Sequence, residues 1–244
     1  MRSKILIFII LIFLTVNCQA QLLEVNAWNT FEGKIGKNES QLTLYLFNNG
    51  VIKGNYVLKA NQSKILVNGK LKGNALILTE AGKPKSIFKG NLFTDTLDKF
   101  DGVFDNPTNN SIPFSFLLTS INWASFGHRY ASMFGTNEEI EKFMEAAKNA
   151  ILSNNKQWVT NHIHFPTRHV LNKGLTSINN KKELMKYYNQ VFTPKFKDKI
   201  RHQYTTNLFN KNGEAMLGDG EIWISNTQKS TAQNYGFTII AINP

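Results

Sequence analysis

An alternation of apolar and polar residues with a period of two constrains the fold most strongly, and it runs from Thr30 to Thr119. Leu42, Leu44 and Leu46, for example, are separated by single residues whose side chains would point to the opposite face of a strand. Asparagine, glycine and proline, which are typical of tight turns, separate about eight such runs. Short consecutive strands joined by tight turns favour an up-and-down antiparallel meander, so residues 28–120 are predicted to form an all-β barrel.

Glycine recurs once in most of these runs, at Gly33, Gly54, Gly69, Gly90 and Gly102. A glycine lets a strand bend at a barrel corner, where a side chain would crowd its neighbour. Residues 31–35 (FEGKI) and 50–56 (GVIKGNY) resemble the opening of small eight-stranded ligand barrels, such as the avidin-like and lipocalin-like proteins. This resemblance implies the barrel architecture, and we carry over no binding residue from it.

The pattern changes from strand-like to helix-like after Gly135. Thr136 and Glu139 form a capping box, which is typical of a helix start. Apolar residues then follow at helical spacing: Ile140, Phe143, Met144, Ala147 and Ile151. The later elements are expected as helices through Trp158, after Asn180 and from Pro194, and as strands over residues 204–209, 215–224 and 237–242. Helices followed by a terminal antiparallel sheet are typical of an α+β domain.

A second resemblance to a known superfamily rests on several segments of the C-terminal half of the chain. They are residues 143–147 (FMEAA), Trp158, residues 164–166 (HFP), residues 184–188 (LMKYY) and residues 218–223 (GDGEIW). Residues 136–244 are similar through them to the nuclear transport factor 2-like (SnoaL-like) superfamily. The resemblance implies a cone, in which a curved antiparallel sheet wraps a long helix and leaves a pocket at its mouth. Some members use this pocket as an enzyme site and others only bind ligands or partners, so the fold alone does not decide the function.

The fold class that follows is an all-β meander barrel and then an α+β cone-shaped domain. Residues 121–135 connect the two and carry four aromatic residues, Trp123, Phe126, Tyr130 and Phe134. Because aromatic side chains gain much from burial, we expect this connector to dock between the domains.

The first twenty residues have the pattern of a secretory signal peptide. Two basic residues precede an apolar segment over residues 5–16, and small residues stand at −3 and −1 of a cleavage point after Ala20. We expect a periplasmic or secreted protein after removal of residues 1–20. The alternative is a lipid anchor at Cys18, and only this alternative predicts a membrane partner. Export disfavours nucleic acid as the partner of a chain with a formal net charge of +11, so we expect an unknown protein or small ligand in the cell envelope.

Three histidines, His162, His164 and His169, lie within residues 161–169. In an extended strand His162 and His164 would share one face. A zinc site needs three or four ligands, and we expect Pro166 and Thr167 to break the strand before His169. We therefore expect neither a metal nor a cofactor and interpret the histidines as polar residues at a strand rim. An acid/base role for His164 is the alternative.

Asp219 and Glu221 form a second candidate site. On one strand they would share a face, and as an acid/base pair they could act together with His164. The interpretation that we favour is a sharp turn or bulge over residues 218–220, with Trp223 filling the core, and the acid/base pair is the alternative.

Two lysines, Lys195 and Lys199, share a face of the helix predicted from Pro194. A solvated helix face is the expected role, and a surface for an acidic partner is the alternative. Together with Tyr188 and Trp223 they are our candidate residues for binding a ligand or partner.

The chain carries none of the common catalytic signatures: no Gly-x-Ser-x-Gly elbow, no phosphate-binding loop and no His-Glu-x-x-His motif. We therefore expect an exported bacterial cell-envelope protein that binds a protein partner or a small ligand without catalysis, and an immunity or inhibitor protein would fit this description. A small-molecule isomerase or hydrolase that uses the cone pocket is the alternative. A structural envelope protein is the third class.

Overall fold

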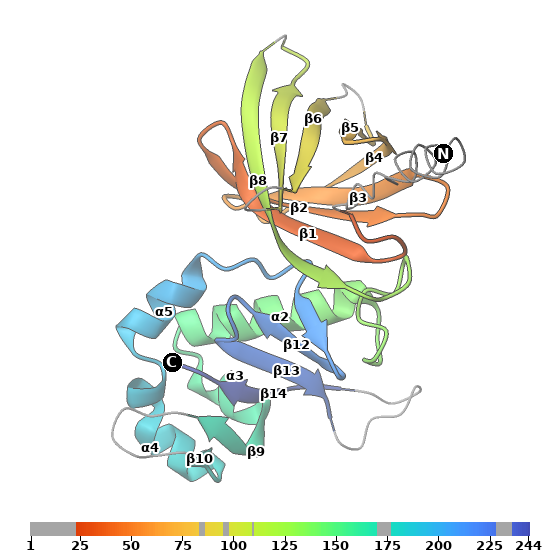
Figure 1. The fold of residues 1–244 in the computed structure, drawn as a ribbon. Coiled ribbons are helices and arrows are strands. Elements are labelled where there is room, and N and C mark those ends of the chain that lie inside the picture. The colour runs from red at the N-terminus through yellow and green to blue at the C-terminus, as the bar shows by residue number, and fades with distance from the viewer. Residues whose placement is uncertain (1–22, 83–85, 95–97, 109, 170–176, 228–235) are drawn as a thin grey trace, which may run out of the picture.

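The computed structural model describes residues 23–82, 86–94, 98–108, 110–169, 177–227 and 236–244. The predicted signal peptide, Cys18 included, lies outside these residues. Two folded units follow one another along the chain, first a barrel and then a mixed sheet with helices (Figure 1). Within the described part of the chain, no helix has the length and apolar character that a membrane span requires.

Eight antiparallel strands form the first unit and close into a barrel in chain order. They are β1 (Trp28–Ile35), β2 (Asn38–Leu46), β3 (Val51–Leu58), β4 (Lys64–Lys72), β5 (Ala75–Glu80), β6 (Ile87–Thr94), β7 (Asp98–Asp105) and β8 (Ser111–Asn122). Strand β1 pairs with β2 on one side and with β8 on the other, which closes the barrel. The meander barrel predicted from the period-two pattern is therefore confirmed.

Apolar side chains fill the interior of the barrel. Phe31, Phe88, Phe100 and Phe116 are fully buried there, in a cluster with the leucines of β2 and β5. Neighbouring rings are in direct contact, and the ring centroids of Phe88 and Phe104 lie 4.6 Å apart. A small eight-stranded barrel either packs its interior with side chains or holds one small ligand, and this barrel is of the packed kind.

Two of the recurring glycines permit a close approach between neighbouring strands. A Cβ atom at Gly54 would lie 2.0 Å from the carbonyl oxygen of Thr43 on β2. A Cβ atom at Gly33 would lie 1.9 Å from the carbonyl oxygen of Ser115 on β8. No side chain fits at these distances, so the recurrence of glycine reflects the sharp bending of the strands around the barrel.

The second unit contains four helices and six strands among the described residues. They are α2 (Asn137–Leu152), α3 (Lys156–Asn161), β9 (Ile163–His169), β10 (Ser177–Ile178), α4 (Lys181–Val191), α5 (Pro194–Arg201), β11 (Phe209–Lys211), β12 (Glu214–Leu217), β13 (Ile222–Asn226) and β14 (Phe237–Ile242). The strand order is β10-β9-β14-β13-β12-β11. Strands β9 and β14 are parallel and the other pairs are antiparallel, so the sheet is mixed and not wholly antiparallel as expected. The long chain segment between β9 and β14 makes the parallel pairing possible.

Two of the predicted strands differ from the observed ones. In the segment 204–209 only Phe209 belongs to a strand, and Asn207 has a φ of 50°, which a regular strand does not accommodate. The predicted strand 215–224 is divided into β12 and β13 by a turn. Gly218 and Gly220 have φ values of 61° and 103° in this turn, a conformation that glycine adopts readily.

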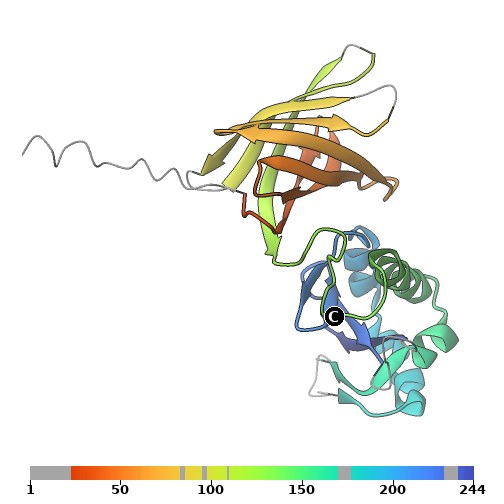
Figure 2. The ribbon, with the colours of Figure 1, turned by 90° about the vertical axis from the view of Figure 1, so that its right-hand side faces the viewer.

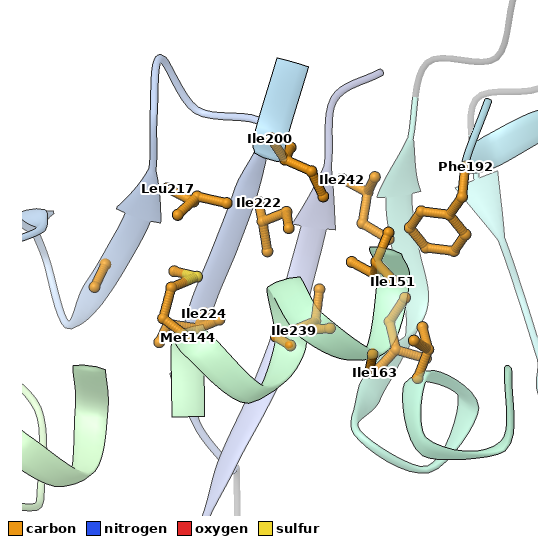
Figure 3. Packing of buried hydrophobic residues seen from close by; sticks show 14 of the residues in the cluster. Met144, Ile151, Ile163, Phe192, Ile200, Leu217, Ile222, Ile224, Ile239 and Ile242 are labelled. Atoms are coloured by element: carbon orange, nitrogen blue, oxygen red, sulfur yellow. The ribbon is translucent and has the colours of Figure 1, made fainter. Parts of the chain in front are cut away.

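One apolar core joins the helices to the sheet. Met144 and Ile151 of α2 point toward Ile222, Ile224 and Ile239 of the sheet (Figure 3). The helix begins with the expected capping box, in which the hydroxyl of Thr136 accepts from the Glu139 amide and the Glu139 carboxylate accepts from the Thr136 amide. The capping prediction is confirmed, whereas the cone shape remains a prediction beside the observed mixed sheet with helices.

The connector between β8 and α2 packs with part of its aromatic residues only. Figure 2 shows the two units as separate lobes with this segment between them. Tyr130 is 2% exposed and belongs to the core of the second unit, and Phe126 stacks on Trp28 of the barrel at 5.6 Å. Trp123 and Phe134 are 69% and 44% exposed. Among the four aromatic residues only Tyr130 is buried, since Phe126 remains 42% exposed although it stacks on Trp28.

Candidate functional site

The outer face of strands β1 to β3 is polar but buried, which identifies it as an interface. Thr30, Gln41, Thr43 and Asn55 alternate with interior residues of the barrel, yet none is more than 6% exposed. On an antiparallel sheet with one face toward solvent, such positions are solvated. Here the second unit and the connector cover them and supply hydrogen-bond partners.

Arg129 of the connector is the centre of this interface and is 2% exposed. Its Nε donates to the carbonyl oxygen of Leu208 at 3.2 Å. Its Nη2 donates to the carbonyl oxygen of Asn207 at 2.9 Å and to Oγ1 of Thr30 at 3.0 Å. Burial lowers the pKa of Arg129, but the ordinary pKa of an arginine is so high that the group stays charged at neutral pH. A single side chain thus holds the connector, the barrel and the second unit together.

Asn207 makes the corresponding contacts from the second unit. Its Nδ2 donates to Oε1 of Gln41 at 3.2 Å and to Oδ1 of Asn55 at 2.8 Å, both on the barrel. Its backbone amide donates to Oε1 of Glu141 at 2.8 Å. Asparagine tolerates positive φ better than most residues do, which suits the left-handed backbone at this position.

Glu141 of α2 is a buried carboxylate, 7% exposed, with a donor from each side of the interface. Lys64 of β4 donates to its Oε2 at 2.5 Å, and the hydroxyl of Tyr130 donates to its Oε1 at 3.0 Å. Burial, with a further contribution from the Glu141 charge, raises the pKa of Tyr130, so the phenol remains a donor at neutral pH. A buried carboxylate needs such partners, and these ones fix the position of the barrel relative to α2.

A cavity of about 360 Å³ lies beside this polar network, between the barrel and the second unit. It is lined by Thr30, Glu32, Gln41, Thr119, Ser120, Ile121, Gln203, Tyr204, Thr206, Asn207, Leu208, Phe209, Met216, Gly218 and Asp219. The first six of these residues belong to the barrel and the others to the second unit. Its volume lies within the range of roughly 300–1,000 Å³ that small-molecule sites occupy.

The residues that line the cavity are mostly polar, and two of them, Glu32 and Asp219, are acidic. Glu32 and Asp219 are exposed and stand one on each side, whereas Tyr204 and Asn207 are buried. Oγ1 of Thr206 is buried and has no hydrogen-bond partner in the protein. Burial raises the pKa of Tyr204, and the charge of Glu32 adds to the shift, so this phenol stays protonated. The arrangement can therefore donate and accept hydrogen bonds to a small polar molecule.

One of the two acidic candidates lines this cavity and the other does not. The turn over residues 218–221 separates Asp219 and Glu221 from any common strand face, so their predicted pairing on one strand is wrong. Asp219 lies at the cavity. Glu221 is 1% exposed, forms an ion pair with Lys199 and accepts from the Asp219 amide at 2.8 Å. The favoured expectation of a turn at 218–220 is confirmed.

The histidines lie outside the residues that line the cavity. His162 ends α3, and its ring stacks on Trp158 at 4.0 Å. Its Nδ1 lies 2.8 Å from the Trp158 carbonyl oxygen. His164 is a partly exposed residue of β9. The expected strand break at Pro166 is wrong because β9 continues to His169, whose side chain lies outside the described part.

No group of three or more histidine, cysteine, aspartate or glutamate side chains that could hold a metal ion occurs in the described ranges of the chain.

The remaining candidate residues have different environments. Tyr188 is fully buried, its hydroxyl has no hydrogen-bond partner, and burial raises its pKa to about 12. Trp223 is only partly buried, so the expectation that it fills the core is wrong. Lys195 is exposed on α5, while Phe196 and Ile200 face the core, as the amphipathic pattern predicts.

Sequence reasoning missed the residues that build the interface, above all Arg129 and Asn207. Their importance comes from burial against another unit, which a period-two or helical pattern does not reveal. A usable signal was present in β1 to β3, where Thr30, Thr43 and Asn55 supply short uncharged polar side chains at outward positions. Outward positions that face water more often carry charged residues.

Comparison with solved structures gives distant similarity to the barrel part of the chain. No family model matches the chain. No curated protein matches it either. The crystal structure of a rhizavidin–biotin complex is similar over 40% of this chain and 97% of that chain, with a TM-score of 0.34 and 10% sequence identity. The assignment of a closed eight-stranded antiparallel barrel rests on the strand pairing itself.

Proposed function

We propose that this chain is an exported cell-envelope protein that binds a small polar molecule, without catalysis, in the cavity between its two domains. The observation that carries the proposal is Thr206, a residue that lines the cavity and whose Oγ1 is buried without a hydrogen-bond partner in the protein. A buried hydroxyl without a hydrogen bond costs about 1–3 kcal/mol, so native proteins rarely retain one. A bound molecule that accepts from or donates to this hydroxyl would remove that cost.

The positions of the catalytic candidates argue against the isomerase or hydrolase alternative. His164 lies on β9, and Asp219 follows β12, three strands away in the sheet order. With strands about 4.8 Å apart, this separation is about 14 Å and far exceeds hydrogen-bond reach. Glu221 is held by Lys199 and is not among the residues that line the cavity. An acid/base pair of His164 with either carboxylate would need a different arrangement of the sheet.

Export through residues 1–20 and an NTF2-like ancestry of residues 136–244 belong to the same proposal and rest on the sequence patterns alone. The immunity or inhibitor role would replace the small molecule by an acidic protein, and the exposed Lys195 is the residue that such a partner would contact.

Native mass spectrometry of the mature protein, purified from its own host, tests the proposal. We expect a small additional mass on part of the wild-type population. Thr206→Val keeps the shape of the side chain and removes the hydroxyl, so its occupancy should correspond to an affinity about tenfold lower. The free Thr206→Val protein should be at least as stable as the wild type, because no internal hydrogen bond is lost.

Thr94→Val, at the exposed end of β6, is the matched control and should leave the occupancy unchanged. A bare mass for every variant would refute small-molecule binding. A second protein in the complex would instead support the partner-binding role.

A further inference from the structure

We propose that the exposed face of helix α4 binds the surface of a phospholipid bilayer with anionic headgroups, without the help of a lipid anchor. This goes beyond the proposed function, because no residue of α4 is among those that line the cavity. Two observations carry the proposal: a concentration of basic side chains without ion-pair partners, and an apolar side chain exposed among them.

Positive charge is concentrated in the segment that contains α4 and α5. Residues 181–201 hold seven lysines and arginines against two acidic residues, whereas the whole sequence has 28 against 17. Glu183, one of the two acidic residues, accepts a hydrogen bond from the Asn179 amide at 2.8 Å at the start of α4. The surface of this segment therefore has a positive local potential, which attracts anionic partners.

The exposed side of α4 forms one continuous face, which we call the basic face. It consists of Lys182, Met185, Lys186 and Asn189, which are spaced as neighbours on a helix surface and are all exposed. The opposite side of the helix packs into the core of the second unit. Figure 1 shows α4 at the end of the second unit that is remote from the barrel, so the barrel does not block the approach of an extended surface.

The lysines of the basic face differ from those of the barrel in their partners. Among the described residues, the lysines in an ion pair with a carboxylate are Lys59, Lys64, Lys89, Lys99 and Lys199. Four of these belong to the barrel and one to α5, so no lysine of α4 is paired in this part of the chain. Lys186 lies over the ring of Tyr187, with Nζ 5.0 Å from the ring centroid, and remains exposed. The charges of the basic face are thus open to an external partner.

The kind of side chain on this segment favours a lipid surface over an acidic protein. Six of the seven basic residues in 181–201 are lysines. Protein interfaces are enriched in arginine and depleted in lysine, because the planar guanidinium pairs with a carboxylate in a fixed geometry. A lysine places its ammonium at the end of a flexible chain, which suits a headgroup layer without fixed positions.

Met185 supplies the second argument for a bilayer. Its side chain is 45% exposed and lies between Lys182 and Lys186 on the helix surface. An apolar side chain surrounded by lysines enters the boundary between headgroups and acyl chains, while the ammonium groups stay at the level of the phosphates. A hydrated acidic protein surface offers no such apolar layer.

Co-sedimentation with vesicles tests the proposal. The protein is used without residues 1–20, so that neither the predicted signal peptide nor a lipid at Cys18 contributes. One set of vesicles consists of phosphatidylcholine alone, and the other of equal parts of phosphatidylcholine and phosphatidylglycerol. We expect binding to the second set only, and a loss of this binding as salt is added, because the charges are exposed.

Substitutions on α4 should weaken this binding by predictable factors. The double substitution Lys182→Gln and Lys186→Gln should lower the partition coefficient about 25-fold, because each basic residue at an anionic bilayer contributes about fivefold. Glutamine has nearly the helix propensity of lysine, so the fold should not change. Met185→Gln should lower the partition coefficient at least about threefold, through the loss of apolar contact.

The matched control is the double substitution Lys70→Gln and Lys72→Gln on β4. Both lysines are exposed and lie outside the ion pairs of the described residues, and the change in net charge is the same. Because charges more than about 10 Å from the membrane are screened, this variant should lose less than about threefold.

Two results with vesicles would overturn the proposal. The first is an absence of binding to the anionic vesicles. The second is an equal loss in the two double variants, because the net charge and not the basic face would then drive binding. Poly-L-glutamate, titrated separately, represents an acidic protein. If it binds in a manner that requires Lys182 and Lys186 while the vesicles do not bind, the face recognises an acidic polypeptide and the bilayer proposal is wrong.

Discussion

Replacing Arg129 by methionine is the sharpest test of the interface, because this side chain makes three buried hydrogen bonds that span both domains. The guanidinium donates to the carbonyl oxygens of Leu208 and Asn207 and to Oγ1 of Thr30. Methionine has a similar length and fills most of the space, so the cavity left behind is small. The change therefore removes donors with little loss of packing.

The expected cost follows from the acceptors that lose a partner. The Leu208 and Asn207 carbonyls each lose a donor, at about 1–3 kcal/mol apiece, whereas Thr30 still accepts from Thr43 at 3.3 Å. Removing the guanidinium offsets part of this loss, because its Nη1 is buried without a partner. We expect a net decrease of about 3 kcal/mol in the free energy of unfolding.

Urea denaturation, followed by circular dichroism and by tryptophan fluorescence, measures this difference. With an m-value of about 2–3 kcal/mol/M, the midpoint should fall by about 1–1.5 M. We also expect unfolding to become less cooperative, so that the two signals separate, because the domains lose the three hydrogen bonds of Arg129 and keep those of Asn207 and Glu141 between them.

Arg201→Met, at the exposed end of α5, is the control and should cost less than about 1 kcal/mol. An Arg129→Met protein with wild-type stability would show that the buried hydrogen bonds of Arg129 do not hold the domains together.

Two further substitutions test the barrel and the second core. Gly54→Ala should lower the free energy of unfolding by about 2–3 kcal/mol, because the new Cβ would lie 2.0 Å from the Thr43 carbonyl oxygen. Gly82→Ala is the control: open space surrounds this position, so the free energy of unfolding should change by less than about 1 kcal/mol. Urea denaturation measures both. Tyr188→Phe should leave stability unchanged or raise it by up to about 1 kcal/mol, since the hydroxyl has no partner. The raised pKa of Tyr188, about 12 against an ordinary 10, means that the unfolded state releases its proton first. Wild-type stability should therefore fall relative to Tyr188→Phe as the pH rises from about 10 to about 12, and parallel pH profiles would contradict this reasoning.

The sequence predicted the barrel well because its determinants are local. Alternation places the interior leucines and phenylalanines of each strand, and tight turns leave a meander as the simplest connection. The capping box at Thr136 is equally local, and its helix begins where expected. The parallel pairing of β9 with β14 could not be predicted in this way, because it depends on contacts between segments that are distant in the chain.

The candidate site was predicted poorly because it is built from two domains. Asp219 was identified as chemically interesting, but its expected partner Glu221 turned out to be buried against Lys199. The cavity requires the outer face of β1, β2 and β8 to meet residues 203–209, of which 204–209 were expected to form a strand. The left-handed conformation of Asn207 interrupts any strand there and turns its side chain toward the barrel, and no local signal indicates this.

Two residues of the polar interface also line the cavity, so binding in the cavity depends on the interface. Thr30 and Asn207 line the cavity, and both accept hydrogen bonds from the Arg129 guanidinium. Arg129 therefore joins the domains and also positions these two residues of the cavity. A ligand that contacts both walls binds only the joined arrangement, and its affinity falls by the fraction of molecules in which the domains have separated. The Arg129→Met protein should therefore hold less of the native small molecule even in the absence of urea. By linkage, a saturating ligand should restore part of the lost stability and bring the two unfolding signals together again.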